Sequence, residues 1–167
     1  MKRIIFFIFV GLIFSHFNYA FSHKKELHKL ETTNECKKCD LKNIDFSGKD
    51  LSELDFYLTN FIDANLTNTN LSKSYLSLTN LSGANLSGAN LSGANLSGAN
   101  LSGANLSGAN LSGANLTYTE LSGANLVGAN LSGTKFYGSN LSEAYFENTK
   151  KIQVHNHSHF LQHFLSK

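Results

Sequence analysis

The five residues LSGAN repeat seven times without deviation between Leu81 and Asn115. The same spacing extends in both directions, and leucine or phenylalanine occupies all 22 positions spaced five residues apart from Leu41 to Phe146. In an α-helix, which turns about 100° per residue, such residues would be spread around the whole circumference. In a flat sheet, an odd spacing would send successive leucines to opposite faces. The chain must therefore turn a corner in every repeat, and the sequence predicts a solenoid.

The residue two positions before each leucine is predicted to share the interior with it, because residues two apart in an extended segment point the same way. In the central repeats that residue is alanine, as at Ala84. Asparagine and serine are then expected to face solvent, and glycine to occupy the corner, because it adopts backbone angles that other residues find costly. The predicted core stack consists of the leucines of the identical repeats: Leu81, Leu86, Leu91, Leu96, Leu101, Leu106 and Leu111.

Identical repeats do not define their own register, because a slip by one pentapeptide again matches leucine with leucine. We expect the register to be fixed by distinctive residues near the two ends of the array. Lys49 stands at a nominally interior position and is predicted to be a local defect or a side chain that extends its charged end to solvent. The other candidates are phenylalanines and inward polar residues: Phe46, Phe56, Phe61, Phe136, Phe146, Thr69, Ser74 and Thr119.

The LSGAN repeat resembles the pentapeptide-repeat family, whose pattern is alanine, aspartate or asparagine, leucine and two variable residues. The resemblance covers residues 39–146 and implies an all-β fold, a right-handed quadrilateral parallel β-helix with four pentapeptides in each coil. The repeats would then form between five and six coils, a rod roughly 25 Å long at the usual strand spacing. The segment from Cys36 to Leu41 is also similar to the Cys-x-x-Cys-Asp-Leu start of many exported members.

The first 22 residues have the organisation of a secretory signal peptide. Lys2 and Arg3 precede an apolar run over residues 4–14, which is far shorter than the roughly 20 residues needed to span a membrane. Cleavage is predicted after Ser22, with cleavage after Ala20 as the second choice. We therefore expect a periplasmic or secreted protein without a membrane anchor.

Cys36 and Cys39 are the two cysteines of the chain. A thioredoxin-like redox site would need its own strand and helix, and a c-type haem site would need histidine where Asp40 stands. In an oxidising compartment we interpret the two cysteines as a structural pair, with Cys39 at the first inward position and a disulfide to Cys36 as one possibility. Metal binding is the alternative.

Residues 149–167 form the stretch in which the sequence shows helical patterning. Five apolar residues fall on one arc at 100° per residue, and His155, His159 and His163 fall on the opposite arc. The interpretation that we prefer is a capping helix that covers the last coil, as residues 23–38 would cover the first. The alternative is a zinc or copper site, because histidines four residues apart on a helix can share one ion.

The two caps complete a predicted division into four parts: a signal peptide over residues 1–22, an N-terminal cap over 23–38, the β-helix over 39–148 and a histidine-rich capping helix over 149–167. Open solenoid ends expose unpaired strand edges. If the caps left these ends uncovered, two rods could associate end to end.

Charge argues against nucleic acid as a partner. Removing residues 1–22 removes Lys2 and Arg3, which leaves 12 basic and 12 acidic residues. A neutral chain lacks the positive field of a nucleic-acid binder, and it lacks the dense negative charge with which some pentapeptide-repeat proteins imitate DNA. No membrane contact is expected after signal removal.

Catalysis is not expected either. The serines recur in every coil with glycine and asparagine, without a histidine near them in sequence, and no cofactor is implied. The leading hypothesis is a non-catalytic exported scaffold that binds an unknown protein partner. Metal binding through the tail histidines is a second hypothesis. Ice binding by the regular solenoid surface is a third.

Overall fold

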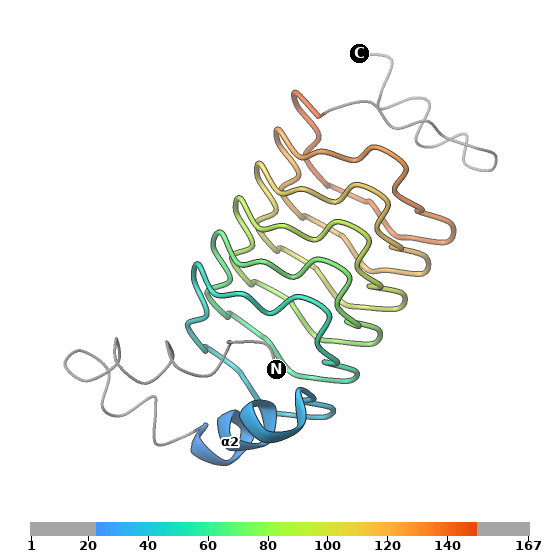
Figure 1. Cartoon of the computed structure of the whole chain (residues 1–167). Coiled ribbons are helices and arrows are strands. Elements are labelled where there is room, and N and C mark those ends of the chain that lie inside the picture. Colours follow the sequence, from blue (N-terminus) through green and yellow to red (C-terminus); the bar gives the residue numbers. More distant parts are fainter. Residues whose placement is uncertain (1–22, 150–167) are drawn as a thin grey trace.

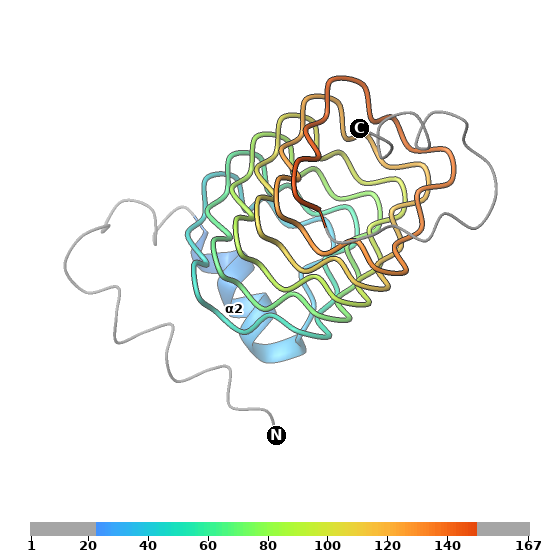
Figure 2. The same cartoon turned by 90° about the horizontal axis from the view of Figure 1, so that it is seen from above.

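Residues 23–149 are described by a computed structural model, in which the repeats stack as a rod (Figure 1). Parallel bridges pair each residue before a core leucine with the equivalent residue of the next coil, as in Asp40 with Asn60 and Asn125 with Tyr145. Each coil therefore contains four pentapeptides, and Figure 2 shows the coils lying one above the next. The fold is the expected right-handed quadrilateral β-helix.

A tight turn closes each pentapeptide. In the turn that begins at Leu41, the N–H of Ile44 donates to the carbonyl oxygen of Leu41 at 3.2 Å, and Asn43 has a φ of 59°. A positive φ at the third residue of a β-turn defines type II and favours glycine. Gly108 occupies the equivalent position with a φ of 65°. The expected place of glycine at the corner is confirmed.

The repeat sequence satisfies every backbone N–H group of a pentapeptide. Two N–H groups, those of Leu101 and Gly103, donate to carbonyl oxygens of the next coil, and that of Asn105 donates to the previous coil. The N–H of Ala104 closes the turn on Leu101. The N–H of Ser102 donates to the Oδ1 atom of the preceding asparagine, Asn100, at 3.0 Å. Because buried amides must be paired, the asparagine is part of the fold and not only a surface residue.

Leucine and alanine fill the interior from all four sides. The leucines Leu81, Leu86, Leu91, Leu96, Leu101, Leu106 and Leu111 have no exposed surface, and the inward alanines of the same repeats are at most 1% exposed. Near the start of the rod, the rings of Phe56 and Phe61 meet edge to face with centroids 5.1 Å apart. Large rings here replace leucine at core positions and distinguish the first coils from the centre.

Polar residues at inward positions direct their hydroxyl groups to backbone carbonyls. Thr69 donates to the carbonyl oxygen of Phe46 at 2.8 Å, and Ser74 donates to that of Leu71 at 2.7 Å. Thr119 donates in the same way to Leu96 at 3.1 Å. Among residues 23–149, no buried side-chain nitrogen or oxygen lacks a hydrogen-bond partner. Lys49 is only partly buried, as expected for a long side chain with its charge near solvent.

Helix α2 (Lys24–Thr33) covers the N-terminal end of the rod (Figure 1). Leu30 is 4% exposed and belongs to the core, and Leu27 packs against the core from the same helix. The helix is capped by Asn34, which has a left-handed backbone conformation and donates its N–H to the carbonyl of Leu30 at 3.0 Å. Helical patterning was expected in the C-terminal tail only, and that expectation is wrong. Two apolar residues three apart are too few to give a periodic signal in the sequence.

Candidate functional site: the outer surface of the rod

Asparagine side chains form ladders along the outside of the rod. On one face, the Nδ2 atom of each asparagine donates to the Oδ1 atom of the residue one coil earlier. The distances along this ladder, from Asp50 through Asn70, Asn90 and Asn110 to Asn130, are between 2.9 and 3.3 Å. Each amide thus joins two coils while its oxygen also accepts the N–H of its own turn. These polar groups are used to hold the rod together.

Glu120 replaces asparagine in one ladder. Its Oε1 atom accepts hydrogen bonds from Nδ2 of Asn140 at 2.7 Å and from the N–H of Ser122 at 3.1 Å. Burial raises the pKa of this carboxyl, but the hydrogen bonds from Asn140 and from Ser122 outweigh burial and lower the pKa below its usual value. Glu120 is therefore a charged structural substitute for an amide, not a proton donor near neutral pH.

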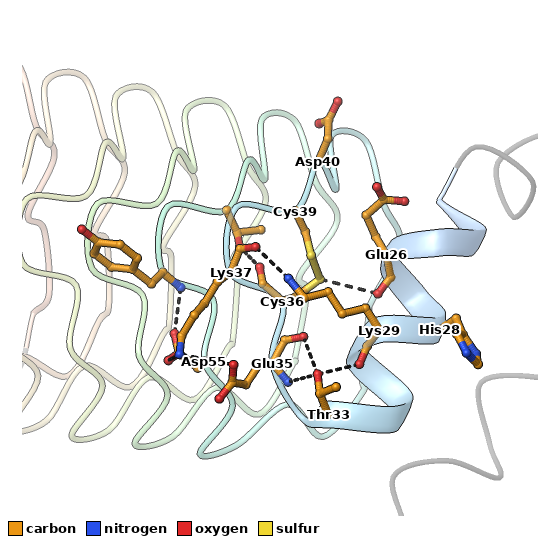
Figure 3. Close-up of a disulfide and its surroundings, with 12 residues drawn as sticks. Glu26, His28, Lys29, Thr33, Glu35, Cys36, Lys37, Cys39, Asp40 and Asp55 are labelled. Carbon is orange, nitrogen blue, oxygen red and sulfur yellow. Dashed lines mark hydrogen bonds and ion pairs between the residues drawn. A yellow bond between two sulfur atoms is a disulfide. The ribbon is translucent and has the colours of Figure 1, made fainter.

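A disulfide joins Cys36 and Cys39 where α2 meets the first coil (Figure 3), with their Cα atoms 5.3 Å apart. Both residues are buried, and Cys36 lies 3.6 Å from the carbonyl oxygen of Glu26 in α2. The disulfide therefore fixes the junction between the cap and the rod. The two sulfur atoms are bonded to each other, so they are not available as a metal-binding thiol pair in this structure.

Lys37 connects two acidic residues on the same junction (Figure 3). Its Nζ atom lies 3.0 Å from Asp55 and 3.2 Å from Glu35, which occupy consecutive levels of one face. The hydrogen bond to Asp55, and to a smaller extent that to Glu35, raises the pKa of Lys37. The lysine reduces the repulsion between two stacked carboxylates. This acidic pair with its single lysine carries one net negative charge.

One longitudinal edge of the rod is apolar, and the sequence reasoning missed it. Of the seven exposed large hydrophobic side chains among residues 23–149, six lie on a single face and the corner that follows it. We call this surface the aromatic edge, and its members are Tyr57, Leu58, Tyr75, Leu78, Tyr118 and Tyr137. The seventh, Tyr145, lies on a different face. Sorting the sequence by the coil length, and not by the repeat length alone, would have revealed the edge.

The predicted metal residues His155, His159 and His163 lie outside the described residues, as do the predicted signal peptide and tail helix. Within residues 23–149, no three histidine, cysteine or carboxylate side chains come together as a potential metal site. In the same part of the chain, no helix has the length and apolar character needed to cross a bilayer.

The sequence model described as pentapeptide repeats matches the chain with eight copies, over residues 39–77, 59–98, 79–117, 94–133 and 114–150. These overlapping matches cover most of the chain. The protein therefore belongs to the pentapeptide repeat family. No curated protein matches the chain at a significant level.

Solved structures of other pentapeptide repeat proteins are similar to this chain. A protein from the thylakoid lumen of Arabidopsis thaliana is 35% identical, with 73% of this chain and 72% of that chain covered and a TM-score of 0.49. HetL from the cyanobacterium Nostoc, involved in heterocyst differentiation regulation, is 28% identical over 66% of this chain and 69% of that chain, with a TM-score of 0.41. QnrB1, a plasmid-mediated fluoroquinolone resistance protein, is 24% identical over 68% of this chain and 62% of that chain. Its TM-score of 0.51 supports the fold alone.

Proposed function

We propose that this protein is a non-catalytic exported scaffold whose rigid outer surface binds a protein partner. The observation that carries the proposal is the use of the repeated polar groups within the rod. Asparagine oxygens accept turn amides, asparagine Nδ2 atoms bridge coils, and inward hydroxyls donate to carbonyls, as at Asn90 and Thr69. A serine or threonine hydroxyl that is held in this way is not beside a base that would activate it. The surface is suited to recognition and not to chemistry.

Export is supported by two independent features. The first is the signal-like organisation of residues 1–22. The second is the disulfide between Cys36 and Cys39, since disulfides persist mainly in oxidising compartments. The test is fractionation of cells that produce the full chain, followed by mass measurement of the exported form. A chain that begins at His23 supports export, whereas uncleaved protein found only in the cytoplasm contradicts it.

The scaffold proposal is tested by chemical cross-linking of the tagged mature protein in the exported fraction of its source cells, with mass spectrometry of the products. The expected result is one reproducible partner cross-linked to surface residues of the rod. Matched variants Tyr75→Asn and Tyr145→Asn, both at ladder positions on different faces, show which face the partner uses. A partner whose recovery is unaffected by unfolding the rod would contradict the proposal.

Metal binding by the tail is a second candidate, favoured by the spacing of His155, His159 and His163. Calorimetric titration of the mature chain with zinc and with copper tests it. Binding that is micromolar or tighter and is lost when the three histidines are replaced by alanine supports the site. An absence of binding heat with both metals removes it.

Ice binding receives no support from the described surface, and we do not propose it. A lattice-matching face needs a continuous column of similar small groups. The outward threonines of the rod, Thr67 and Thr117, lie on different corners, and the serine columns, such as Ser52, Ser72, Ser92, Ser112 and Ser132, are single lines at a corner and not a face.

A further inference from the structure

The aromatic edge has a symmetric pattern along the rod. After a first level with the charged residues Lys37 and Lys38, large apolar side chains occupy two levels, with Tyr57 and Leu58 followed by Tyr75 and Leu78. They occupy the last two levels as well, at Tyr118 and then Tyr137. The middle level between them has the small residues Ser97 and Gly98. The order along the edge is therefore large, large, small, large, large.

Contacts within the edge hold these side chains in place. The rings of Tyr118 and Tyr137 meet edge to face with centroids 5.5 Å apart. A Cβ atom added to Gly138 would lie 2.5 Å from Tyr118, and one added to Gly98 would lie 2.7 Å from Leu78. Leu78 and Tyr118 therefore each extend over the glycine one coil later. Tyr118 and Tyr137 remain 66% and 58% exposed, so these contacts leave most of both rings open.

A two-fold axis perpendicular to the rod at the level of Ser97 would superpose this pattern on itself. Each residue would then face the residue of a second copy that lies equally far from the middle level on the same column. Tyr57 would face Tyr137 of the second copy, and Leu78 would face Tyr118. Leu58 would face Gly138, and Tyr75 would face Asn115, so two of the four matches pair a large side chain with a small or polar one. The small residues at the middle level would allow the two backbones to approach closely on the axis.

The charges at the two ends of the edge match the same arrangement. Asp55 and Lys135 lie on one column at equal distances from Asn95, and both are at bridge positions. At the first end, Glu35 and Asp55 share Lys37, and exposed Lys38 at the adjoining corner makes this end neutral overall, whereas Lys135 is exposed and positive. Antiparallel copies would bring Lys135 of each opposite Asp55 of the other. Parallel copies would instead bring like charges together, which disfavours that orientation.

We propose that the aromatic edge is an interface for a second copy of this chain, docked side by side and antiparallel about the middle level. The edge extends over four coil spacings, about 19 Å along the rod. A strip of this length and one corner wide covers less than the roughly 800 Å² per partner that a standard stable interface buries. The dimer is therefore expected to be weak and concentration-dependent, with a dissociation constant in the micromolar range or above.

The first test measures the mass of the mature protein by sedimentation at protein concentrations from about 1 µM to about 1 mM, which bracket such a dissociation constant. The edge variant Tyr75→Asn, Leu78→Gly and Tyr118→Gly restores the LSGAN pattern at each site, so it retains the fold. We expect it to weaken self-association at least tenfold. The matched control Tyr145→Asn also restores asparagine at a ladder position, but on another face, and should dimerise as the original chain does.

The second test locates the axis by disulfide cross-linking. Ser97→Cys places a thiol at the middle level, where it would face its own copy, and should form covalent dimers rapidly under mild oxidation. Ser107→Cys is the matched control, because Ser107 has the same turn position and the same Asx hydrogen bond on another corner. Lys135→Glu should weaken the dimer about fivefold or more, whereas Lys73→Glu on another corner should leave it unchanged.

Several results would overturn the proposal. A protein that stays monomeric up to 1 mM, an edge variant that dimerises normally, or equal cross-linking of both cysteine variants would each do so. Dimers that are lost on removal of residues 152–167, but not in the edge variant, would indicate end-to-end association instead. Monomers that begin to dimerise when this segment is removed would mean that the chain's own tail covers the edge.

Discussion

Asn60 donates a hydrogen bond from Nδ2 to Oδ1 of Asp40, one coil earlier, at 2.9 Å. This pair shows how aspartate and asparagine are divided along the rod. The four ladder positions of the first complete coil are Asp40, Asp45, Asp50 and Asp55, and asparagine predominates in the coils that follow. A carboxylate only accepts hydrogen bonds, whereas an amide both accepts and donates. Aspartate therefore suits the start of a ladder, and asparagine suits every later position.

Replacing Asn70 by aspartate tests this division. Asn70 donates to Asp50 at 2.9 Å and accepts from Asn90 at 3.1 Å. Aspartate would keep the acceptor but lose the donor, and it would place two carboxylates one coil apart. We expect a loss of about 1 to 2 kcal/mol in the free energy of unfolding at pH 7, measured by urea denaturation.

The pH dependence of the same variant provides the internal check. Repulsion between the stacked carboxylates raises their pKa values in the folded protein, so protonation on acidification relieves the strain. The loss in the free energy of unfolding caused by Asn70→Asp should therefore become smaller as the pH is lowered from 7 to 3. The control Asp50→Asn keeps an acceptor for Asn70 and should have little effect at pH 7. An equal deficit in both variants would contradict the division of roles.

The corner glycines should differ from one another in tolerance only through their surroundings. Gly108 has a φ of 65° and nothing within 4 Å of an added Cβ atom. Gly108→Ala should therefore lower the free energy of unfolding only because alanine is held in a left-handed backbone conformation, which costs about 1 kcal/mol. Gly108→Asn should cost less, because asparagine adopts this conformation more easily, as Asn68 does two coils earlier on the same column. Thermal unfolding of the two variants measures the difference. Equal destabilisation by alanine and asparagine would show that the backbone angle is not the cause.

The sequence predicted the coil better than it predicted the surface. A leucine every five residues constrains the interior so strongly that the solenoid, the inward alanines and the glycine corners all follow from spacing. The number of pentapeptides per coil does not follow from spacing, since it depends on the angle of each turn, and it came from the family resemblance. The aromatic edge becomes visible only when residues such as Leu58 and Leu78 are aligned one coil apart. Helix α2 has too few apolar residues to give a helical pattern in the sequence. It forms because Leu27 and Leu30 pack against the first coil.

Removal of the disulfide should affect one end of the rod. Closing the short loop between Cys36 and Cys39 is worth about 2 kcal/mol on a chain-entropy estimate. Because each coil contacts only its neighbours, Cys36→Ala with Cys39→Ala should loosen α2 and the first coil and leave the centre intact. Hydrogen exchange is expected to accelerate at Leu41 and not at Leu101. Uniform acceleration along the rod would contradict this local role.

Glu120 should contribute a pH-dependent part of the stability. Hydrogen bonds from Asn140 and Ser122, acting against burial, lower its pKa in the folded protein below the ordinary value of 4.5. A lowered folded pKa means that the contribution is present above pH 4.5 and is lost as the pH falls through the folded pKa. The stability difference between the original chain and Glu120→Gln should therefore decrease from pH 7 to pH 3. A difference that grows on acidification would contradict the assigned shift.

The position of a cavity along the rod should determine how much it destabilises the fold. Leu101 has no exposed surface and lies between coils on both sides, so Leu101→Ala leaves a cavity that the flanking coils cannot fill without breaking their hydrogen bonds. We expect a loss of about 3 to 4 kcal/mol in the free energy of unfolding. Leu141 is 5% exposed and lies in the last described coil, where neighbours adjust more easily, so Leu141→Ala should cost about half as much. Urea denaturation of both variants measures the ratio, and equal losses would mean that the rod unfolds as one unit without a weaker end.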